Sequence, residues 1–185
     1  MSQINIVENK PALLIDVFND NKTNRVLVIS DLHIGKMYWL QNTDISIDWY
    51  HIVREIEKEL TDIVISNKVT SIVLLGDIKN NIYKVGKEDW NLIPNFLHSL
   101  SEICEVYLIP GNHDSRIGLI TPEKVHLIGV KGMVLGDILL THGHFDHVGE
   151  AFDLAKKHNA PIIASPELIA IAQKHGVQNV IPISV

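Results

Sequence analysis

Four clusters of acidic and histidine side chains lie between residues 26 and 147, and each of the first three follows a short apolar run. In chain order they are Asp31-Leu32-His33, Gly76-Asp77, Gly111-Asn112-His113-Asp114 and His142-Gly143-His144-Phe145-Asp146-His147. Carboxylate, amide and imidazole groups are the oxygen and nitrogen ligands that divalent metal ions bind in proteins. Because two-metal hydrolytic centres combine such ligands, the pattern predicts one shared metal centre.

The first two clusters predict a cation site with a bridging carboxylate. Asp31 and His33 are two residues apart, and such residues share a face on an extended chain, so both are expected to bind one ion. Gly76 allows close approach of the backbone, and the carboxylate of Asp77 after it can bridge two cations. Taken alone, each short motif is also typical of a polar turn, so the prediction depends on their joint occurrence.

The third cluster adds groups that can act on a substrate. The side-chain carbonyl of Asn112 is a neutral oxygen ligand, and His113 can donate a proton to a leaving group. Asp114 can orient that imidazole, as carboxylates behind a functional histidine often do. The alternative is a polar turn closed by a hydrogen bond from the asparagine side chain.

Apolar runs and amphipathic segments predict the elements that position these clusters. Fully apolar runs at residues 26–29, 72–75 and 106–109 are typical of strands buried on both faces. Helical spacing of apolar residues predicts a helix over 52–64, and a weaker one covers 89–100. Strands that alternate with helices indicate a largely parallel sheet, and its functional loops are expected at the carboxyl ends of the strands.

The remainder of the chain has a different pattern. Residues 127–140 predict a β-hairpin that turns near 130–132 or 136–137. A helix over 148–158 and a strand at 162–163 are expected to follow. Ser165 is expected to cap a further helix that starts at Pro166. The apolar residues from Val180 to Val185 then predict a last strand.

Composition limits the class of protein. The chain has 185 residues, which predicts a single domain over 1–185 with a substantial core. A net charge of −6 without basic runs argues against a broad nucleic-acid-binding face. The single cysteine, Cys104, excludes an intramolecular disulfide and fits a reducing cytoplasm. No apolar run approaches the roughly 20 residues of a membrane span, so we expect a cytoplasmic protein.

Considered together, D-x-H, G-D and G-N-H-D resemble the calcineurin-like metallophosphoesterase family, and residues 28–36 are especially similar to its ICC-like phosphoesterase branch. The resemblance covers about residues 10–144 and implies an α/β sandwich of mixed, largely parallel sheet flanked by helices. It further implies two divalent metal ions, manganese first, with iron, zinc or nickel as alternatives, and a bridging hydroxide that attacks phosphorus. By this resemblance Asp31 and His33 bind one ion, Asp77 bridges both, Asn112 and His142 bind the other, and His113 acts on the leaving group.

The fourth cluster departs from that family. A further G-H-x-H motif is expected after His142 and is absent from the sequence, which leaves His144 and His147 as candidates for the missing ligand. The order H-x-H-x-D-H instead resembles the metallo-β-lactamase-fold hydrolases, and this resemblance covers residues 139–185. It implies that His142 and His144 bind one zinc ion while Asp146 and His147 bind another. The sequence therefore predicts a family junction near 139–147 and an atypical or incomplete C-terminal part.

The leading functional hypothesis is a dinuclear phosphoester hydrolase. Its expected substrate is a phosphorylated small molecule, a nucleotide or another phosphodiester, without a membrane partner or a strong nucleic-acid-binding surface. Two alternatives remain open at this point: a metallo-β-lactamase-fold hydrolase, and a non-catalytic metal-binding hybrid that lacks the last ligand motif. An unfinished sheet edge would also favour a homo-oligomer.

Overall fold

The computed structural model describes residues 2–8, 10–19, 22–36, 48–143 and 145–182, without the side chains of residues 19, 145–147 and 149. Six strands form the main sheet, and two helices and a short 3-10 helix accompany it. In chain order these elements are β1 (Ser2–Ile6), β2 (Ala12–Asn19), β3 (Lys22–Ile29), α1 (Trp49–Asn67), β4 (Ser71–Leu75), α2 (Asp89–Ser101), β5 (Glu105–Ile109), η2 (Ile117–Leu119) and β6 (Val125–Leu127).

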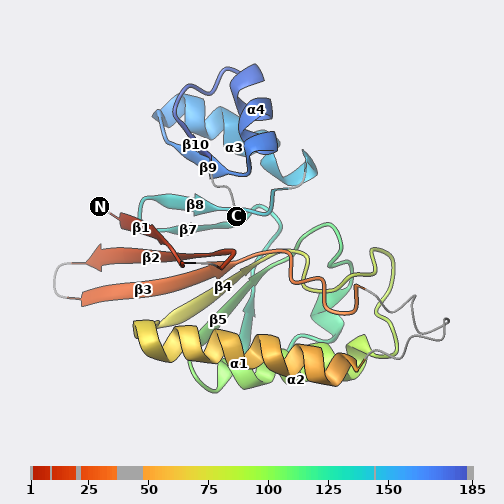
Figure 1. Cartoon of the computed structure of the whole chain (residues 1–185). Helices are drawn as coiled ribbons and strands as arrows, with labels where there is room; N and C mark the ends of the chain where they lie inside the picture. The colour runs from red at the N-terminus through yellow and green to blue at the C-terminus, as the bar shows by residue number, and fades with distance from the viewer. Residues whose placement is uncertain (1, 9, 20–21, 37–47, 144, 183–185) are drawn as a thin grey trace.

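The main sheet is mixed and has the order β1-β2-β3-β4-β5-β6. The first three strands are antiparallel, and the strands from β3 to β6 are parallel (Figure 1). Because β3, β4 and β5 are parallel neighbours, the loops that follow them emerge at one edge of the sheet. The predicted α/β class, with a mixed and largely parallel sheet flanked by helices, is confirmed.

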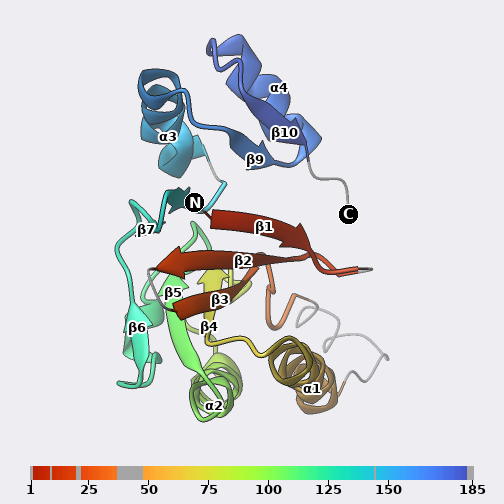
Figure 2. The same cartoon turned by 90° about the vertical axis from the view of Figure 1, so that its left-hand side faces the viewer.

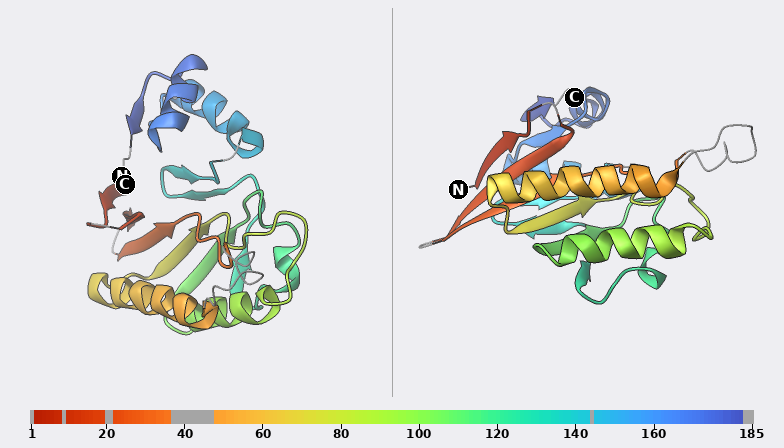
Figure 3. Two further views of the ribbon diagram at one scale, coloured as in Figure 1. Left: turned by 45° about the vertical axis from the view of Figure 1, so that its right-hand side comes forward. Right: turned by 60° about the horizontal axis from the view of Figure 1, so that its bottom comes forward.

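Helix α1 begins and ends with recognisable capping groups. The carboxylate of Asp48 accepts a hydrogen bond of 3.1 Å from the backbone N–H of His51. At the other end, Lys68 adopts a left-handed backbone with φ of 54°. Val53, Leu60 and Val64 form part of its buried face and pack in the core against one side of the sheet. Helices α1 and α2 lie next to each other on this side (Figures 2 and 3).

Helix α2 runs through a proline that the sequence predicted to start or kink it. The helix begins at Asp89, and Pro94 lies inside it, where a proline removes one backbone donor. The missing backbone hydrogen bond destabilises the helix, and burial of neighbouring apolar side chains offsets this loss, since Ile93 and Leu97 are fully inaccessible to solvent. No helix within the described ranges is long and apolar enough to cross a membrane.

A short hairpin covers the other side of the sheet. It consists of β7 (Met133–Leu135) and β8 (Ile138–Leu140), and its partly buried Met133, Leu135 and Ile138 pack with buried Leu140 against the sheet. The predicted hairpin over 127–140 was too long, because β6 pairs in parallel with β5 instead. The turn falls at Gly136, whose φ of 62° favours glycine.

The C-terminal residues form a small unit with its own apolar cluster. It contains α3 (Phe145–His158), β9 (Ile162–Ala164), α4 (Pro166–Lys174) and β10 (Val180–Pro182), and β9 pairs in parallel with β10. Ser165 caps α4 as predicted, accepting a hydrogen bond of 3.5 Å from Leu168. The unit lies beyond the hairpin, at the top of Figure 1. Its cluster begins at Val148, whereas the second cluster of the main sheet ends at Leu140, so the two apolar clusters share no residue.

One charged pair joins the antiparallel strands to α1. Asp16 on β2 lies opposite Arg25 on β3, and the guanidinium donates hydrogen bonds of 2.7 and 2.8 Å to its carboxylate. A third guanidinium N–H reaches the carbonyl of Asn67, the last residue of α1. The hydrogen bonds from Arg25 lower the pKa of buried Asp16.

We predict that Asp16→Asn destabilises the fold at neutral pH by about 1 kcal/mol, the size expected for a partly exposed ion pair. Since the folded-state pKa of Asp16 is lowered, its contribution is complete above the unfolded pKa of about 3.9 and is lost as the pH falls through the folded value. Urea unfolding at pH 7 and pH 3 should therefore show the difference between wild type and variant shrinking at the lower pH. The exposed Asp62→Asn is the control, and a pH-independent difference would contradict the prediction.

Candidate metal centre

Unusual backbone conformations mark the loops after β3 and β4. Asp31, His33 and Asp77 have φ of 57°, 44° and 53°, in the left-handed region that few residues other than glycine adopt. The expectation that Asp31 and His33 lie on an extended chain is therefore wrong. The two loops are joined instead by backbone hydrogen bonds from Asp31 to Gly76, 3.1 Å, and from His33 to Asp77, 2.8 Å. Such strained residues cluster at functional sites in proteins.

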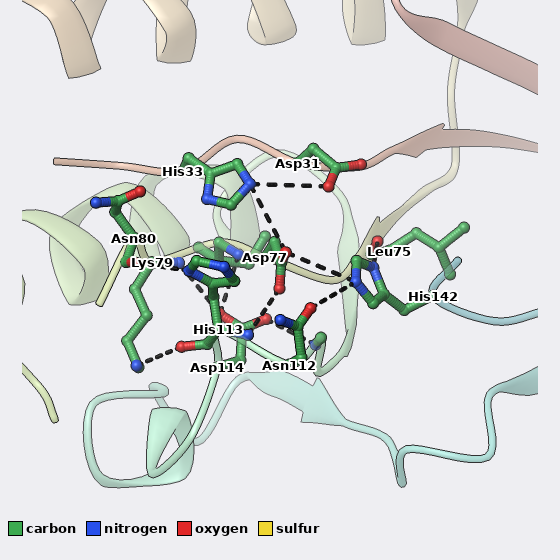
Figure 4. Close-up of polar contacts among 12 residues, drawn as sticks. Asp31, His33, Leu75, Asp77, Lys79, Asn80, Asn112, His113, Asp114 and His142 are labelled. Carbon is green, nitrogen blue, oxygen red and sulfur yellow. Dashed lines mark hydrogen bonds and ion pairs between the residues drawn. The ribbon is translucent and has the colours of Figure 1, made fainter. Parts of the chain in front are cut away.

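Asp77 lies at the centre of the converging side chains (Figure 4). Only 4% of its surface is exposed. Its Oδ1 accepts a hydrogen bond of 2.9 Å from the backbone N–H of His113. Its Oδ2 lies 3.7 Å from Nε2 of His33 and 3.6 Å from Nε2 of His142. The other carboxylate, that of Asp31, lies 3.8 Å from the same atom of His33.

These side chains form two groups that share one carboxylate. In each group the possible ligand atoms lie within 4.8 Å of one another. One group is His33, Asp77 and His113, and the other is Asp31, Asp77 and His142. The structure thus brings the sequence-predicted residues of four separate loops together, although it associates Asp31 with His142 and His33 with His113.

Backbone carbonyls orient two of the histidines. Nδ1 of His113 lies 2.6 Å from the carbonyl oxygen of Asn80, and Nδ1 of His142 lies 3.2 Å from that of Leu75. A carbonyl can only accept, so each Nδ1 carries the proton and, in the neutral ring, the lone pair lies on Nε2. In His142 this atom faces Oδ1 of Asn112 at 3.2 Å and the carboxylate of Asp77. Metal-binding histidines have this arrangement: one ring nitrogen donates its N–H to a carbonyl, and the other presents its lone pair beside further acceptor atoms.

His33 has a different environment. Burial lowers the pKa of His33, and the neighbouring His113 and Lys36 act in the same direction, while Asp77 and Asp31 oppose the shift. Its Nδ1 is buried without a hydrogen-bond partner among the described residues. The neutral imidazole, which is the form that binds metal ions, is thereby favoured. The donor set as a whole, with its carboxylates, amide and neutral imidazoles, fits divalent cations.

Two glycines make room for these ligands. A Cβ added at Gly76 would lie 2.3 Å from Nδ1 of His142, and one added at Gly111 would lie 2.3 Å from Oδ1 of Asp77. Side chains at these positions would occupy the space of the predicted ligands. The glycines of G-D and G-N-H-D are therefore part of the site, although they contribute no ligand atom.

Asp114 makes other contacts than the sequence predicted. Its carboxylate accepts hydrogen bonds from the backbone N–H groups of Ile78 and Lys79, at 3.0 and 3.1 Å, and of Gly111 at 2.9 Å. Burial raises the pKa of Asp114, and the hydrogen bonds from the backbone amides of Gly111 and Lys79 counteract the shift. These bonds join the loops after β4 and β5, whereas the imidazole of His113 is oriented by the carbonyl of Asn80.

Three residues of the fourth cluster cannot be placed with the others. His144 lies outside the described residues, and the side chains of Asp146 and His147 are outside the description as well, although both belong to α3. Their roles as ligands stay predictions. Lys79, in contrast, is a residue that sequence reasoning missed: it is fully buried beside the centre, and burial lowers the pKa of its ammonium. Its position directly after Asp77-Ile78 is the only signal that the sequence offers.

One region of the chain is similar to a known protein family. Residues 110–182 match the metallo-beta-lactamase superfamily. The match contains the H-x-H-x-D-H motif that suggested this family. It begins at residue 110, before residue 139 where the sequence resemblance was expected to begin, and so includes the Gly111-to-Asp114 loop.

Curated relatives of this chain are described as UPF0173 metal-dependent hydrolases. The relative from Koribacter versatilis is 36% identical over 77 residues, which cover 34% of this chain and 33% of that protein. The relative from Rubrobacter xylanophilus is 36% identical over 64 residues, which cover 35% of this chain and 25% of that protein. The relative from Staphylococcus aureus is 52% identical over 44 residues, which cover 23% of this chain and 19% of that protein. The chain thus spans a third or less of the length of these relatives.

A solved structure also resembles this fold in part. It is described as the crystal structure of Pseudomonas putida nuclease MPE, and it superposes with a TM-score of 0.46 at 18% sequence identity. The superposition covers 76% of this chain and 66% of that one.

The contact of Gly111 with Asp77 leads to a prediction about metal binding. Gly111→Ala should displace the carboxylate of Asp77 and weaken Mn²⁺ binding by about 10-fold or more, as changes behind metal ligands do. Isothermal titration of the metal-free protein with Mn²⁺ measures this. Gly129→Ala is the matched control, because a Cβ there meets nothing within 4 Å. Equal affinities of the two variants would show that the site does not depend on this clearance.

Proposed function

We propose that this chain is a metal-dependent hydrolase of phosphoesters, with two adjacent cation sites that share Asp77. The observation that carries the proposal is the pair of three-residue groups centred on that buried carboxylate. The relatives described as metal-dependent hydrolases support the hydrolytic class, and phosphoester specificity rests on the D-x-H, G-D and G-N-H-D loops. The proposed substrate is a phosphorylated small molecule, a nucleotide or another phosphodiester.

The residues have distinct roles in this proposal. Two divalent cations held there, with manganese as the first candidate, would supply Lewis-acid stabilisation of the phosphoryl oxygens and activation of water. As the imidazolium, with protons on both nitrogens, His113 would donate its Nε2 proton to the leaving oxygen, while its Nδ1–H stays bonded to the carbonyl of Asn80. Asp114 would keep the two loops together. The sequence resemblance assigns Asp31, His33 and Asp77 to one ion and Asp77, Asn112 and His142 to the other, and we keep these ligand sets in the proposal. The close approach of Asp31 to His142 makes Asp31 a further candidate for the second ion, and His144 and His147 are candidates from the fourth cluster.

The family match supports a second candidate function. In a metallo-β-lactamase-type hydrolase the ligands would be His142, His144, Asp146 and His147, all within the matched residues 110–182. The first candidate is supported by the convergence of Asp31 and His33 with Asp77, since Asp31 and His33 lie outside the match. A third candidate is a metal-binding hybrid without turnover. The three candidates differ in which carboxylates matter and in whether bound metal leads to hydrolysis.

We predict that Asp77→Ala lowers hydrolysis of bis(p-nitrophenyl) phosphate with Mn²⁺ by at least about 100-fold, because it removes the carboxylate shared by both groups. Elemental analysis should give two equivalents of metal for wild type and one or fewer for the variant. Full activity of Asp77→Ala would refute the proposal. Exposed Asp62→Ala is the control for loss of a carboxylate elsewhere.

The same assay separates the remaining candidates. Loss of activity in Asp146→Ala together with full activity in Asp31→Ala would establish the metallo-β-lactamase-type centre. Wild-type protein that holds metal and hydrolyses none of the phosphate or lactam test substrates would establish the hybrid. Loss of activity in Asp31→Ala supports the phosphoesterase.

A further prediction concerns the proton donor. His113→Ala should lower the rate about 10²-fold or more for a phenyl or alkyl phosphodiester, whose leaving group needs a proton, and much less for the p-nitrophenyl ester. Metal content should remain at the wild-type value. An equal loss on both substrates, accompanied by loss of metal, would show that His113 is a ligand and not the proton donor.

A further inference from the structure

The side chain of Lys79 is fully buried, with 0% of its surface exposed. Lysine is almost never fully buried unless its charge is compensated. The residue lies two positions after Asp77, in a segment that forms a bridge with Ile34. Its ammonium donates hydrogen bonds to the backbone carbonyls of Asn81 and His113 (Figure 4). A buried cation therefore joins the loop after β4 to the loop after β5, at the residue proposed to move the proton.

Two adjacent residues hold His113 at two different points. Lys79 binds its backbone carbonyl, and the carbonyl of the next residue, Asn80, accepts the hydrogen bond from Nδ1 of its imidazole at 2.6 Å. The distance between Lys79 and Asn80 along the chain is fixed by covalent geometry. Anchoring the backbone of His113 to Lys79 thus sets where its ring meets the carbonyl of Asn80.

The charges around Lys79 complement those contacts. The carboxylates that attract its ammonium are those of Asp114, Asp89 and Asp77. Asp114 joins the same two loops through backbone amides. Its carboxylate thus accepts from N–H groups of the loops, while the ammonium of Lys79 donates to their carbonyl groups. A methionine of similar length would fill the space of Lys79 and leave both carbonyls without this donor.

We propose that Lys79 is a positioning residue for His113. Its ammonium holds the turn at 79–81 against the loop after β5, so that the carbonyl of Asn80 keeps the imidazole proton on Nδ1 and leaves Nε2 directed toward the group of His33 and Asp77. The catalytic meaning of this orientation rests on the proposed function. The orientation itself is a property of the metal-free protein and can be measured there.

The first experiment is long-range ¹H–¹⁵N correlation NMR of the imidazoles in metal-free protein, with His113→Gln to assign the signal. Wild type should show His113 as the Nδ1–H tautomer. Lys79→Met should give a mixture with the Nε2–H tautomer, which free imidazole side chains favour, while Lys84→Met, at an exposed position, should match wild type. An unchanged tautomer in Lys79→Met would overturn the proposal.

The second experiment is a double-mutant cycle on a phenyl phosphodiester. Lys79→Met should lower kcat by about 10-fold, in the range for groups that orient a functional histidine, with little change in KM or metal content. The effect should disappear when His113→Ala is already present. An equal loss in both backgrounds would show that Lys79 acts through the fold and would overturn the proposal.

Two provisions keep both experiments decisive. If Lys79→Met does not fold, Lys79→Gln replaces it, since its amide is neutral and too short to reach both carbonyls; the same outcomes apply. If wild type shows no hydrolysis, the proposed function fails, and the NMR comparison alone then decides the role of Lys79.

Discussion

The carboxylate of Asp114 accepts hydrogen bonds from three backbone amides, two in the loop after β4 and one in the loop after β5. The metal centre depends on these hydrogen bonds between the two loops, because Asp77 belongs to the first loop and His113 to the second. A buried carboxylate that satisfies three amides resists separation of the loops, since each bond lost would leave a polar group without a partner in the interior. The ammonium of Lys79 performs the reciprocal task for the carbonyls.

The parallel strands explain why much of the fold and of the site could be predicted from the sequence. Strands buried on both faces consist of continuous apolar residues, which made β3, β4 and β5 recognisable at 26–29, 72–75 and 106–109. Parallel pairing then requires that the polar residues after each strand meet at one edge. Asp31, Asp77 and His113 were therefore expected to lie together, and the structure places Asp31 in one group and His113 in the other, with Asp77 common to both.

Other features depend on contacts between distant residues and could not be predicted from local patterns. The left-handed backbone of Asp31 and His33 is supported by hydrogen bonds to Gly76 and Asp77, more than forty residues later. Burial of Lys79 depends on the carbonyl of His113 in the loop after β5, more than thirty residues away, whereas propensity alone places lysine at the surface. The pairing of β6 with β5 likewise excluded the predicted turn near Val130, and the hairpin turns instead at Gly136-Asp137, the other predicted position.

The register of the β7–β8 hairpin helps to position His142 in the metal centre. Strand β8 carries His142 two residues after Leu140, and its ladder with β7 consists of the pairs Met133–Leu140, Val134–Leu139 and Leu135–Ile138. Side chains alternate along a strand, so a slip of one residue would turn buried Leu140 to solvent and carry His142 away from Asp77. The remaining ligands come from the main sheet and would stay in place. The register of this short ladder, together with the contacts of His142 with Leu75 and Asn112, therefore sets how far His142 reaches into the centre.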